Sequence, residues 1–290
     1  MALVMKTGAK VPVAPKPKVT VTLPTQPSEP ATELRDYTML WYGAKGIGKT
    51  TLAAEFPGAL FINTEPGTKA LRVYSTPARN WEQMVATIDA IVADKSGKFK
   101  TVIVDTVDLA YEYAFQHICK KKMIAHPNEE NDFGQTWKEI KGAFREQMGR
   151  LMACKAVVFL SHDTEKEIEL RDGNKVDRVQ PTMASQALNE IEGIVDIVGH
   201  YCFERDVRFM RLVGSQVEVA KCRCEENFVR KGGKPRTPGD KILSIPMGLT
   251  PQESYKNLLL AFNNGQVDVD PLTSSTSEPV VKKSLTLKKK

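Results

Sequence analysis

The sequence predicts an α/β fold, in which a mainly parallel sheet is flanked by helices and extended by an antiparallel hairpin near its C-terminal end. Short, almost continuously apolar runs alternate with helical stretches between residues 38 and 160. That alternation is typical of parallel strands that are buried on both faces. The first apolar run also leads through a glycine-rich loop, Gly43–Thr51, into a helix-like segment. After residue 197 the apolar runs shorten and alternate with polar residues, which indicates antiparallel strands.

Four apolar runs are interpreted as the parallel strands. Each is rich in β-branched, aromatic or other large apolar residues and is too short to be read as a helix. They are Thr38–Tyr42, Ala59–Asn63, Thr101–Val104 and Ala156–Leu160.

The helices are predicted from apolar residues spaced three or four apart. Met84, Ile88 and Ile91 show this spacing, so they would form one buried face of a helix. The last helix would end at Asn263-Asn264-Gly265, because glycine and asparagine favour helix termini. The predicted helices are Trp81–Ala93, Leu109–Lys122, Thr136–Cys154 and Pro251–Phe262.

The antiparallel hairpin is predicted from two alternating runs. Val207–Leu212 and Val217–Ala220 are separated by Gly214-Ser215, a pair that favours a turn. We expect these two runs to pair with each other and to continue the sheet.

The composition predicts one globular domain, residues 35–265, between two tails. The chain has 290 residues, of which 41% are hydrophobic and 26% charged, and this suits a single medium-sized core. Residues 1–34 are rich in proline and lysine, and residues 266–290 form a Ser/Thr-rich basic tail; both are expected to be flexible. The tails are read as solvated linkers in preference to electrostatic arms. The net charge of +6 permits nucleic-acid binding without establishing it.

The five cysteines are too irregularly spaced to indicate disulfides or a zinc site. No apolar run has the length of a membrane span, and the start of the chain does not resemble a secretory signal. We therefore expect a cytoplasmic location, which would be the host bacterial cytoplasm if the chain is phage-encoded.

The glycine-rich loop has the pattern of a phosphate-binding P-loop, G-x-x-x-x-G-K-T. Its glycines allow backbone N–H groups to surround a polyphosphate at the start of a helix, and its lysine would reach the β- and γ-phosphates. A chance match in a glycine-rich turn is the weaker alternative, because the flanking strand and helix are both present. The loop reads Gly43-Ala44-Lys45-Gly46-Ile47-Gly48-Lys49-Thr50, and Thr51 follows it.

Two carboxylates are candidates for the chemistry around a bound nucleotide. Asp105 ends an apolar strand, where it would hold Mg²⁺ together with Thr50; it would otherwise cap the next helix. Asp108 is a weaker candidate for the same role. Glu65 follows another strand, where it would orient the attacking water, unless it is an ordinary loop glutamate.

The order of these pieces resembles the RecA-like ATPases over about residues 36–262. Phe61-Ile62-Asn63-Thr64-Glu65 is similar to the stretch that supplies the family's catalytic glutamate, and Val104-Asp105-Thr106 to its metal-binding strand. The resemblance implies that His162, where the family commonly has glutamine, senses the γ-phosphate. It also implies that Lys221 and Arg223 act across a subunit interface in a homo-oligomer.

More narrowly, the chain resembles the small phage-encoded RecA-like proteins of single-strand annealing and recombination. The resemblance implies ATP and Mg²⁺ as cofactors, ATP hydrolysis, single-stranded DNA as a partner and, as a further candidate, a single-strand-binding protein. A replication adaptor or loader that binds nucleotide is the alternative, and a small-molecule kinase is a weaker one.

The segment Asp163–Met183 occupies the place of the family's DNA-contacting loop. Asp172-Gly173-Asn174 suggests the tip of a hairpin, and its lysines and arginines are candidates for phosphate contacts. Because acids balance these bases and no aromatic residue is present, a solvated surface hairpin remains the alternative. Arg230–Arg236, which lacks acids, is a second candidate for backbone contact.

Overall fold

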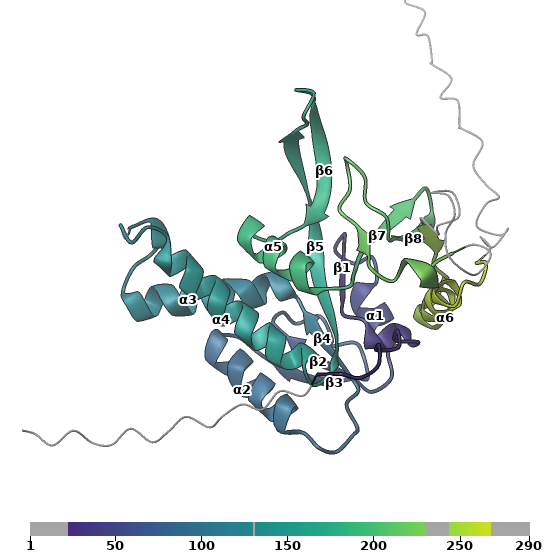
Figure 1. The fold of residues 1–290 in the computed structure, drawn as a ribbon, viewed down its shortest axis with the longest axis horizontal. Coiled ribbons are helices and arrows are strands. Elements are labelled where there is room, and N and C mark those ends of the chain that lie inside the picture. Colours follow the sequence, from purple (N-terminus) through teal and green to yellow (C-terminus); the bar gives the residue numbers. More distant parts are fainter. Residues whose placement is uncertain (1–22, 130, 230–243, 268–290) are drawn as a thin grey trace, which may run out of the picture. The chain divides into compact units, whose positions relative to one another are not determined.

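The computed structural model describes residues 23–129, 131–229 and 244–267. Its centre is a mixed sheet in which neighbouring strands follow the order β10-β8-β7-β1-β5-β4-β2-β3 (Figure 1). The run from β7 to β3 is parallel throughout, and β8, β10 and β9 add to it in the antiparallel sense. The parallel strands are β1 (Met39–Gly43), β2 (Ala59–Asn63), β3 (Tyr74–Pro77), β4 (Thr101–Asp105), β5 (Ala156–Glu169) and β7 (Ile197–Glu204).

Antiparallel strands and helices complete the fold. The strand β6 pairs only with β5, so these two strands form an arm that projects from the sheet (Figure 1). The antiparallel strands are β6 (Lys175–Pro181), β8 (Val207–Arg211), β9 (Lys221–Cys222) and β10 (Ser244–Pro246). The helices are α1 (Lys49–Ala53), α2 (Trp81–Ala93), α3 (Val107–Lys122), α4 (Gln135–Met152), α5 (Ser185–Ile194) and α6 (Pro251–Phe262), with 3₁₀ turns at Leu34–Asp36, Pro127–Glu129 and Glu225–Asn227.

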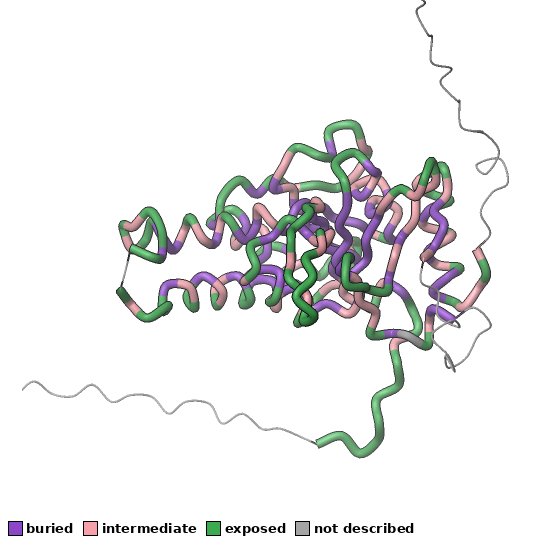
Figure 2. The backbone as a smooth tube through the Cα atoms, turned by 90° about the horizontal axis from the view of Figure 1, so that it is seen from above, coloured by how far each residue is buried: buried purple, intermediate pink, exposed green. Residues whose placement is uncertain are grey.

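The core lies on both faces of the sheet, because successive strand residues point to opposite sides. In β1, Leu40 and Tyr42 pack with α2, α3, α4 and α5, whereas Met39 and Trp41 pack with α1 and α6. Figure 2 shows the buried residues concentrated along the strands and on the inner sides of the helices. This two-sided burial explains why the parallel strands read as continuous apolar runs.

The predicted parallel sheet and its flanking helices are confirmed. Each of the four predicted strands and four predicted helices is present, with bounds that differ by a few residues at most except in β5. The strand β5 continues nine residues past the predicted end at Leu160, as a charged strand of the arm. The helix α6 ends as expected: Asn264 has φ +61°, and the N–H of Gly265 donates to the carbonyl of Leu260 at 2.8 Å.

The antiparallel extension is confirmed, but the predicted pairing within it is wrong. Val207–Arg211 pairs with β7 and β10, and not with Val217–Ala220. Backbone hydrogen bonds instead join Val217 and Val219 to Val179 of the arm, at 2.9 and 3.1 Å. The segment 217–220 therefore lies against the arm, and its alternation does not follow burial, because Val217 is exposed and Glu218 is buried. The strand β3 and the helix α5 were not predicted.

Other features bear on the remaining expectations. All five cysteines are free. Within the described part of the chain, none of the helices combines the length and the apolar character that a membrane crossing requires. Residues 23–31 contain no helix or strand. Most of the two predicted tails and the basic stretch Arg230–Arg236 lie outside the described residues.

Candidate nucleotide-binding site

The glycine-rich loop lies at the carboxyl end of β1 and opens into α1. Gly48 precedes the helix with φ +110°, a conformation that side chains strongly disfavour. At Gly43 a Cβ atom would lie 2.0 Å from the carbonyl oxygen of Tyr201 in β7. Both glycines are therefore required by the backbone. Residues 44–46 are exposed, so the loop presents its backbone to solvent above the helix start.

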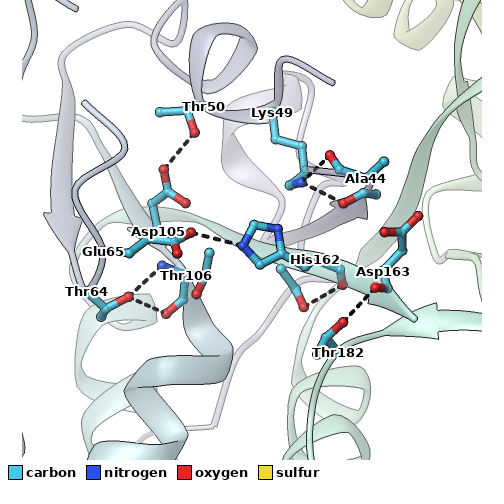
Figure 3. Close-up of polar contacts among 12 residues, drawn as sticks. Ala44, Lys49, Thr50, Thr64, Glu65, Asp105, Thr106, His162, Asp163 and Thr182 are labelled. Carbon is cyan, nitrogen blue, oxygen red and sulfur yellow. Dashed lines mark hydrogen bonds and ion pairs between the residues drawn. The ribbon is translucent and has the colours of Figure 1, made fainter. Parts of the chain in front are cut away.

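The side chain of Lys49 folds back onto the backbone of this loop. Its Nζ donates to the carbonyls of Gly43 and Ala44, at 2.7 and 3.0 Å, and its side chain is buried (Figure 3). Burial lowers the pKa of Lys49, and the negative charge of Asp105 opposes this effect. A buried ammonium that is held mainly by carbonyl groups fits a site for an anionic ligand such as a polyphosphate.

Thr50 and Asp105 meet beside the loop as the sequence predicts. The hydroxyl of Thr50 donates to Asp105 Oδ2 at 2.8 Å, and Asp105 is 3% exposed (Figure 3). Burial raises the pKa of the Asp105 carboxyl, and the charge of Glu65 adds to this. A hydroxyl and a carboxylate are ligands that Mg²⁺ prefers, and a bound cation would offset the cost of burying this charge. The pair therefore fits a magnesium site.

Glu65 and His162, which lie on different strands, also come together. Nε2 of His162 lies 3.1 Å from Glu65 Oε1, and both side chains face the region between Lys49 and Asp105 (Figure 3). The carbonyl of Asp105 accepts hydrogen bonds from the N–H groups of Thr64 and Glu65, at 2.9 and 3.4 Å. The segment that carries Glu65 is thereby tied to β4, the strand that ends at Asp105.

Three residues that support this arrangement were missed in the sequence. The Thr64 hydroxyl exchanges hydrogen bonds with the backbone of Thr106, and Tyr113 of α3 donates to the Thr64 carbonyl at 3.0 Å. Gly67 leaves room beside Asp105, since a Cβ there would lie 3.3 Å from Asp105 Oδ2. Only the glycine carried a local signal, because it closely follows a strand; the other contacts join residues more than 40 positions apart.

Lys221 and Arg223 are not brought to the site within the chain. Lys221 Nζ donates to the carbonyls of Glu192 and Val195, the latter at 2.9 Å, and Arg223 donates to the carbonyl of Gly193 at 2.8 Å. Both cations therefore neutralise the C-terminal end of α5. Lys221 pairs with Val198 near the start of β7, whereas the loop lies at the far end of the strands. Their predicted action across a subunit interface stays a prediction.

The arm formed by β5 and β6 separates its charges by face. Side chains of directly paired residues share a face, so Lys166 and Arg178 lie together, and Ile168 and Val176 lie next along the same face. In the paired part of the arm, residues 163–181, this face carries no acid. The opposite face carries Asp163, Glu165, Glu167, Glu169, Asp177 and one cation, Lys175, which is bound to Glu167 at 2.7 Å.

Comparison with known proteins gives a relative from a phage. The SPbeta prophage-derived uncharacterized protein YorG of Bacillus subtilis (strain 168) is 24% identical over 194 residues. The match covers 65% of this chain and 57% of YorG, so the chain spans less than two thirds of that relative's length.

Solved structures give weaker similarities. The RadB recombinase has a TM-score of 0.39 at 14% identity, covering 75% of this chain and 89% of that one. A second structure, which is an ATPase domain, has a TM-score of 0.41 at 10% identity, covering 81% and 86%. The flagellar accessory protein FlaH of Methanocaldococcus jannaschii has a TM-score of 0.31 at 8% identity, covering 61% and 76%. At these scores the similarities carry no argument.

A protein-family model decides the assignment. Residues 35–224, well over half of the chain, match the model described as an AAA domain. This match and the prophage relative support the predicted resemblance to phage P-loop ATPases, and the glycine-rich loop and the parallel sheet agree with it. The chain belongs to the AAA domain family of P-loop proteins.

Proposed function

We propose that this chain is a magnesium-dependent ATPase that acts on single-stranded DNA in phage recombination or strand annealing. The observation that carries the proposal is the convergence of a buried lysine, a hydroxyl–carboxylate pair and a glutamate–histidine pair at one edge of the sheet. In this arrangement Lys49 holds the β- and γ-phosphates, and Thr50 and Asp105 hold Mg²⁺.

Glu65 supplies the group that activates water. A carboxylate beside the γ-phosphate accepts a proton from the attacking water, and its hydrogen bond to His162 fixes its direction. When bound, Mg²⁺ neutralises charge on the phosphates. His162 would report the state of the γ-phosphate to the arm, because the same strand, β5, contains the histidine and half of the arm.

The arm supports single-stranded DNA as the partner. Its acid-free face carries exposed Lys166 and half-buried Arg178, which suits contact with a phosphate backbone. The opposite face is acidic and repels nucleic acid, so DNA is expected to bind on the acid-free face. A homo-oligomer, in which Lys221 and Arg223 approach a neighbouring site, and an interaction with a single-strand-binding protein complete the proposal.

Steady-state ATP hydrolysis with Mg²⁺ tests the proposal, with and without single-stranded DNA. Lys49→Ala should abolish turnover, and Glu65→Ala should lower it at least a hundredfold. Full turnover by Glu65→Ala would contradict the role of that residue. Turnover that ignores DNA would contradict the DNA partner, and tight ATP binding without turnover would favour a replication adaptor or loader.

The arm offers a matched pair of variants for the DNA contact. Lys166→Ala removes a cation from the acid-free face, whereas Lys175→Ala removes one from the acidic face. We expect only Lys166→Ala to weaken DNA binding and to lower its salt dependence by about one counterion. Equal effects of the two changes would mean that DNA does not distinguish the acid-free face of the arm from the acidic face.

A further inference from the structure

Several buried side-chain atoms near the nucleotide site have no hydrogen-bond partner among the residues that the structure describes, including Asn63 Oδ1 and Thr106 Oγ1. Two others are Nδ1 of His162, whose other ring nitrogen contacts Glu65, and Oδ1 of Asp108. Buried polar atoms without partners are uncommon in native proteins, and each one calls for an explanation. These two are complementary, because an imidazole N–H donates and a carboxylate oxygen accepts.

The strand register places the two residues on neighbouring elements. Asp105, at the end of β4, pairs with Leu160 of β5, so His162 lies beyond the end of β4. There β5 runs alongside the first turn of α3, in which Asp108 is the second residue, and α3 packs against β5. His162 is also among the charges that act on the Asp108 carboxyl, which places the two side chains within electrostatic range.

We propose that Asp108 is a positioning residue whose carboxylate accepts a hydrogen bond from Nδ1–H of His162, directly or through one water molecule. This contact fixes the imidazole ring at Nδ1, so that Nε2 stays directed at Glu65. The inference rests on the function proposed above, because the pair matters for turnover only if Glu65 and His162 act on a bound nucleotide. It gives Asp108 a role distinct from magnesium binding.

The identity of the sensing residue explains why such a partner is needed. Histidine has two ring nitrogens, and a contact to only one of them leaves the ring free to tilt about that contact. Because a carboxylate accepts at each nitrogen, the proposed arrangement places a proton on both, so the ring is in its imidazolium form. Glutamine, common at this position in the RecA-like family, has its donor and acceptor at the same end and needs nothing behind it. The aspartate is therefore expected to matter only while position 162 is a histidine.

Asp108 also benefits from this contact. Its carboxyl is buried without a cationic partner at hydrogen-bond distance among the described residues, and burial raises its pKa to about 6. A hydrogen bond from an imidazole N–H would offset part of the cost of the buried charge, and the carboxyl pKa stays raised. The same bond therefore satisfies both unpartnered atoms.

A double-mutant cycle on the full chain tests the proposal through ATP hydrolysis. Asp108→Asn should lower kcat on the order of tenfold with KM within about twofold. The change disturbs the orientation of His162 and Glu65, but Asp108 itself does not contact the nucleotide. In the His162→Gln background the same change should alter kcat less than about twofold. Glu112→Gln, an exposed acid on the same helix, is the matched control and should change neither parameter.

Several outcomes of the double-mutant cycle would overturn the proposal. An equal loss of kcat in both backgrounds would show that Asp108 acts independently of His162. An unchanged kcat in Asp108→Asn, or a loss that added Mg²⁺ restores, would likewise contradict a positioning role.

A second measurement does not depend on turnover. The chain has four histidines, so ¹⁵N NMR can follow their ring nitrogens in the presence of Mg²⁺ and a non-hydrolysable ATP analogue, with His162→Gln providing the assignment. We expect a protonated Nδ1 at His162 in the wild type and a shifted Nδ1 resonance in Asp108→Ala. Identical His162 resonances in the two proteins would overturn the inference. If the wild type hydrolysed no ATP but its His162 responded to Asp108→Ala, the proposed function would fail while this contact would stand.

Discussion

Asp108→Asn should stabilise the folded protein, and the gain should grow with pH. Burial raises the pKa of the Asp108 carboxyl from 3.8 to about 6, and the charge of Glu65 contributes in the same direction, against its own backbone N–H and His162. The folded state therefore binds this proton more tightly than the unfolded state does. Stability falls as the pH rises from about 4 to about 6, and the loss is complete above that range.

The size of the effect follows from the shift. At about 1.36 kcal/mol per pKa unit, a change from 3.8 to about 6 corresponds to about 3 kcal/mol of lost stability at neutral pH. Asparagine does not titrate, so the variant escapes this loss. Because the carboxyl is already almost fully ionised in the unfolded state at pH 5, about half of the loss is present there, and the advantage of the variant should grow by about 1.4 kcal/mol between pH 5 and pH 8.

Urea unfolding of both proteins at pH 5, 6, 7 and 8, without nucleotide or Mg²⁺, measures this difference. Glu112→Gln should differ from the wild type by less than about 0.5 kcal/mol at every pH, because this acid is exposed. A stability difference between Asp108→Asn and the wild type that does not change with pH would refute the reasoning. A gain in stability beside a loss of turnover would instead mark Asp108 as a residue kept for activity.

Three further changes have outcomes that the structure defines. Mg·ATP at a hundred times its Kd should stabilise the wild type by about 2.7 kcal/mol in thermal unfolding, and Lys49→Ala should lose this gain. Gly43→Ala should lower the free energy of unfolding by about 1–3 kcal/mol and abolish ATP binding in a filter assay, because the added Cβ clashes with the Tyr201 carbonyl. Normal ATP binding would show that the loop can shift to accommodate the Cβ. Glu218→Gln should cost about 3 kcal/mol in urea unfolding, because buried His200 and half-buried Arg211 both bind this buried carboxylate and keep its pKa lowered despite its burial. Glu204, which also binds Arg211 but whose side chain is 41% exposed, is its control. Glu204→Gln should cost less than about 1 kcal/mol, and equal costs would contradict the importance of burial.

The fold could be predicted from the sequence where one physical requirement dominates. Parallel strands buried on both faces must be apolar throughout, so β1, β2 and β4 were visible as runs. The strand β5 was visible only as far as Leu160, because beyond this residue it leaves the core and its charged residues give no such signal. The wrong hairpin has a related cause: alternation marks a half-buried strand without naming its partner.

The candidate site could be predicted as separate pieces. The loop and the carboxylates were found because their chemistry requires particular residues at the ends of strands. Their mutual contacts, such as that between Glu65 and His162, depend on which strands lie side by side. Lys221 and Arg223 contact the end of α5 within the chain, and a single sequence does not show whether they also act across an interface, so that role stays a prediction. The proposed role of Asp108 becomes visible only through two unsatisfied atoms.

The base of the arm should determine how DNA binding affects the nucleotide site. Thr182, which follows β6, donates from its hydroxyl to the Asp163 carbonyl at 2.8 Å, and from its N–H to the carbonyl of His162 at 2.8 Å (Figure 3). These bonds join the returning strand of the arm to β5 at the histidine itself. A shift of the arm on DNA would therefore be passed to His162 through this junction.

Thr182→Val keeps the shape and the N–H but removes the hydroxyl bond. The loss of a bond of about 1 kcal/mol should lower the stimulation of ATP hydrolysis by single-stranded DNA up to about fivefold. Hydrolysis without DNA should stay within about twofold of the wild type, because the change keeps the bond from the Thr182 N–H to the His162 carbonyl and removes only the hydroxyl bond to Asp163. Thr164→Val is the control, since this exposed hydroxyl on the arm bonds only to the neighbouring Glu165 carbonyl at 3.5 Å. Full stimulation in Thr182→Val, or an equal loss in Thr164→Val, would mean that the junction at His162 does not carry the signal.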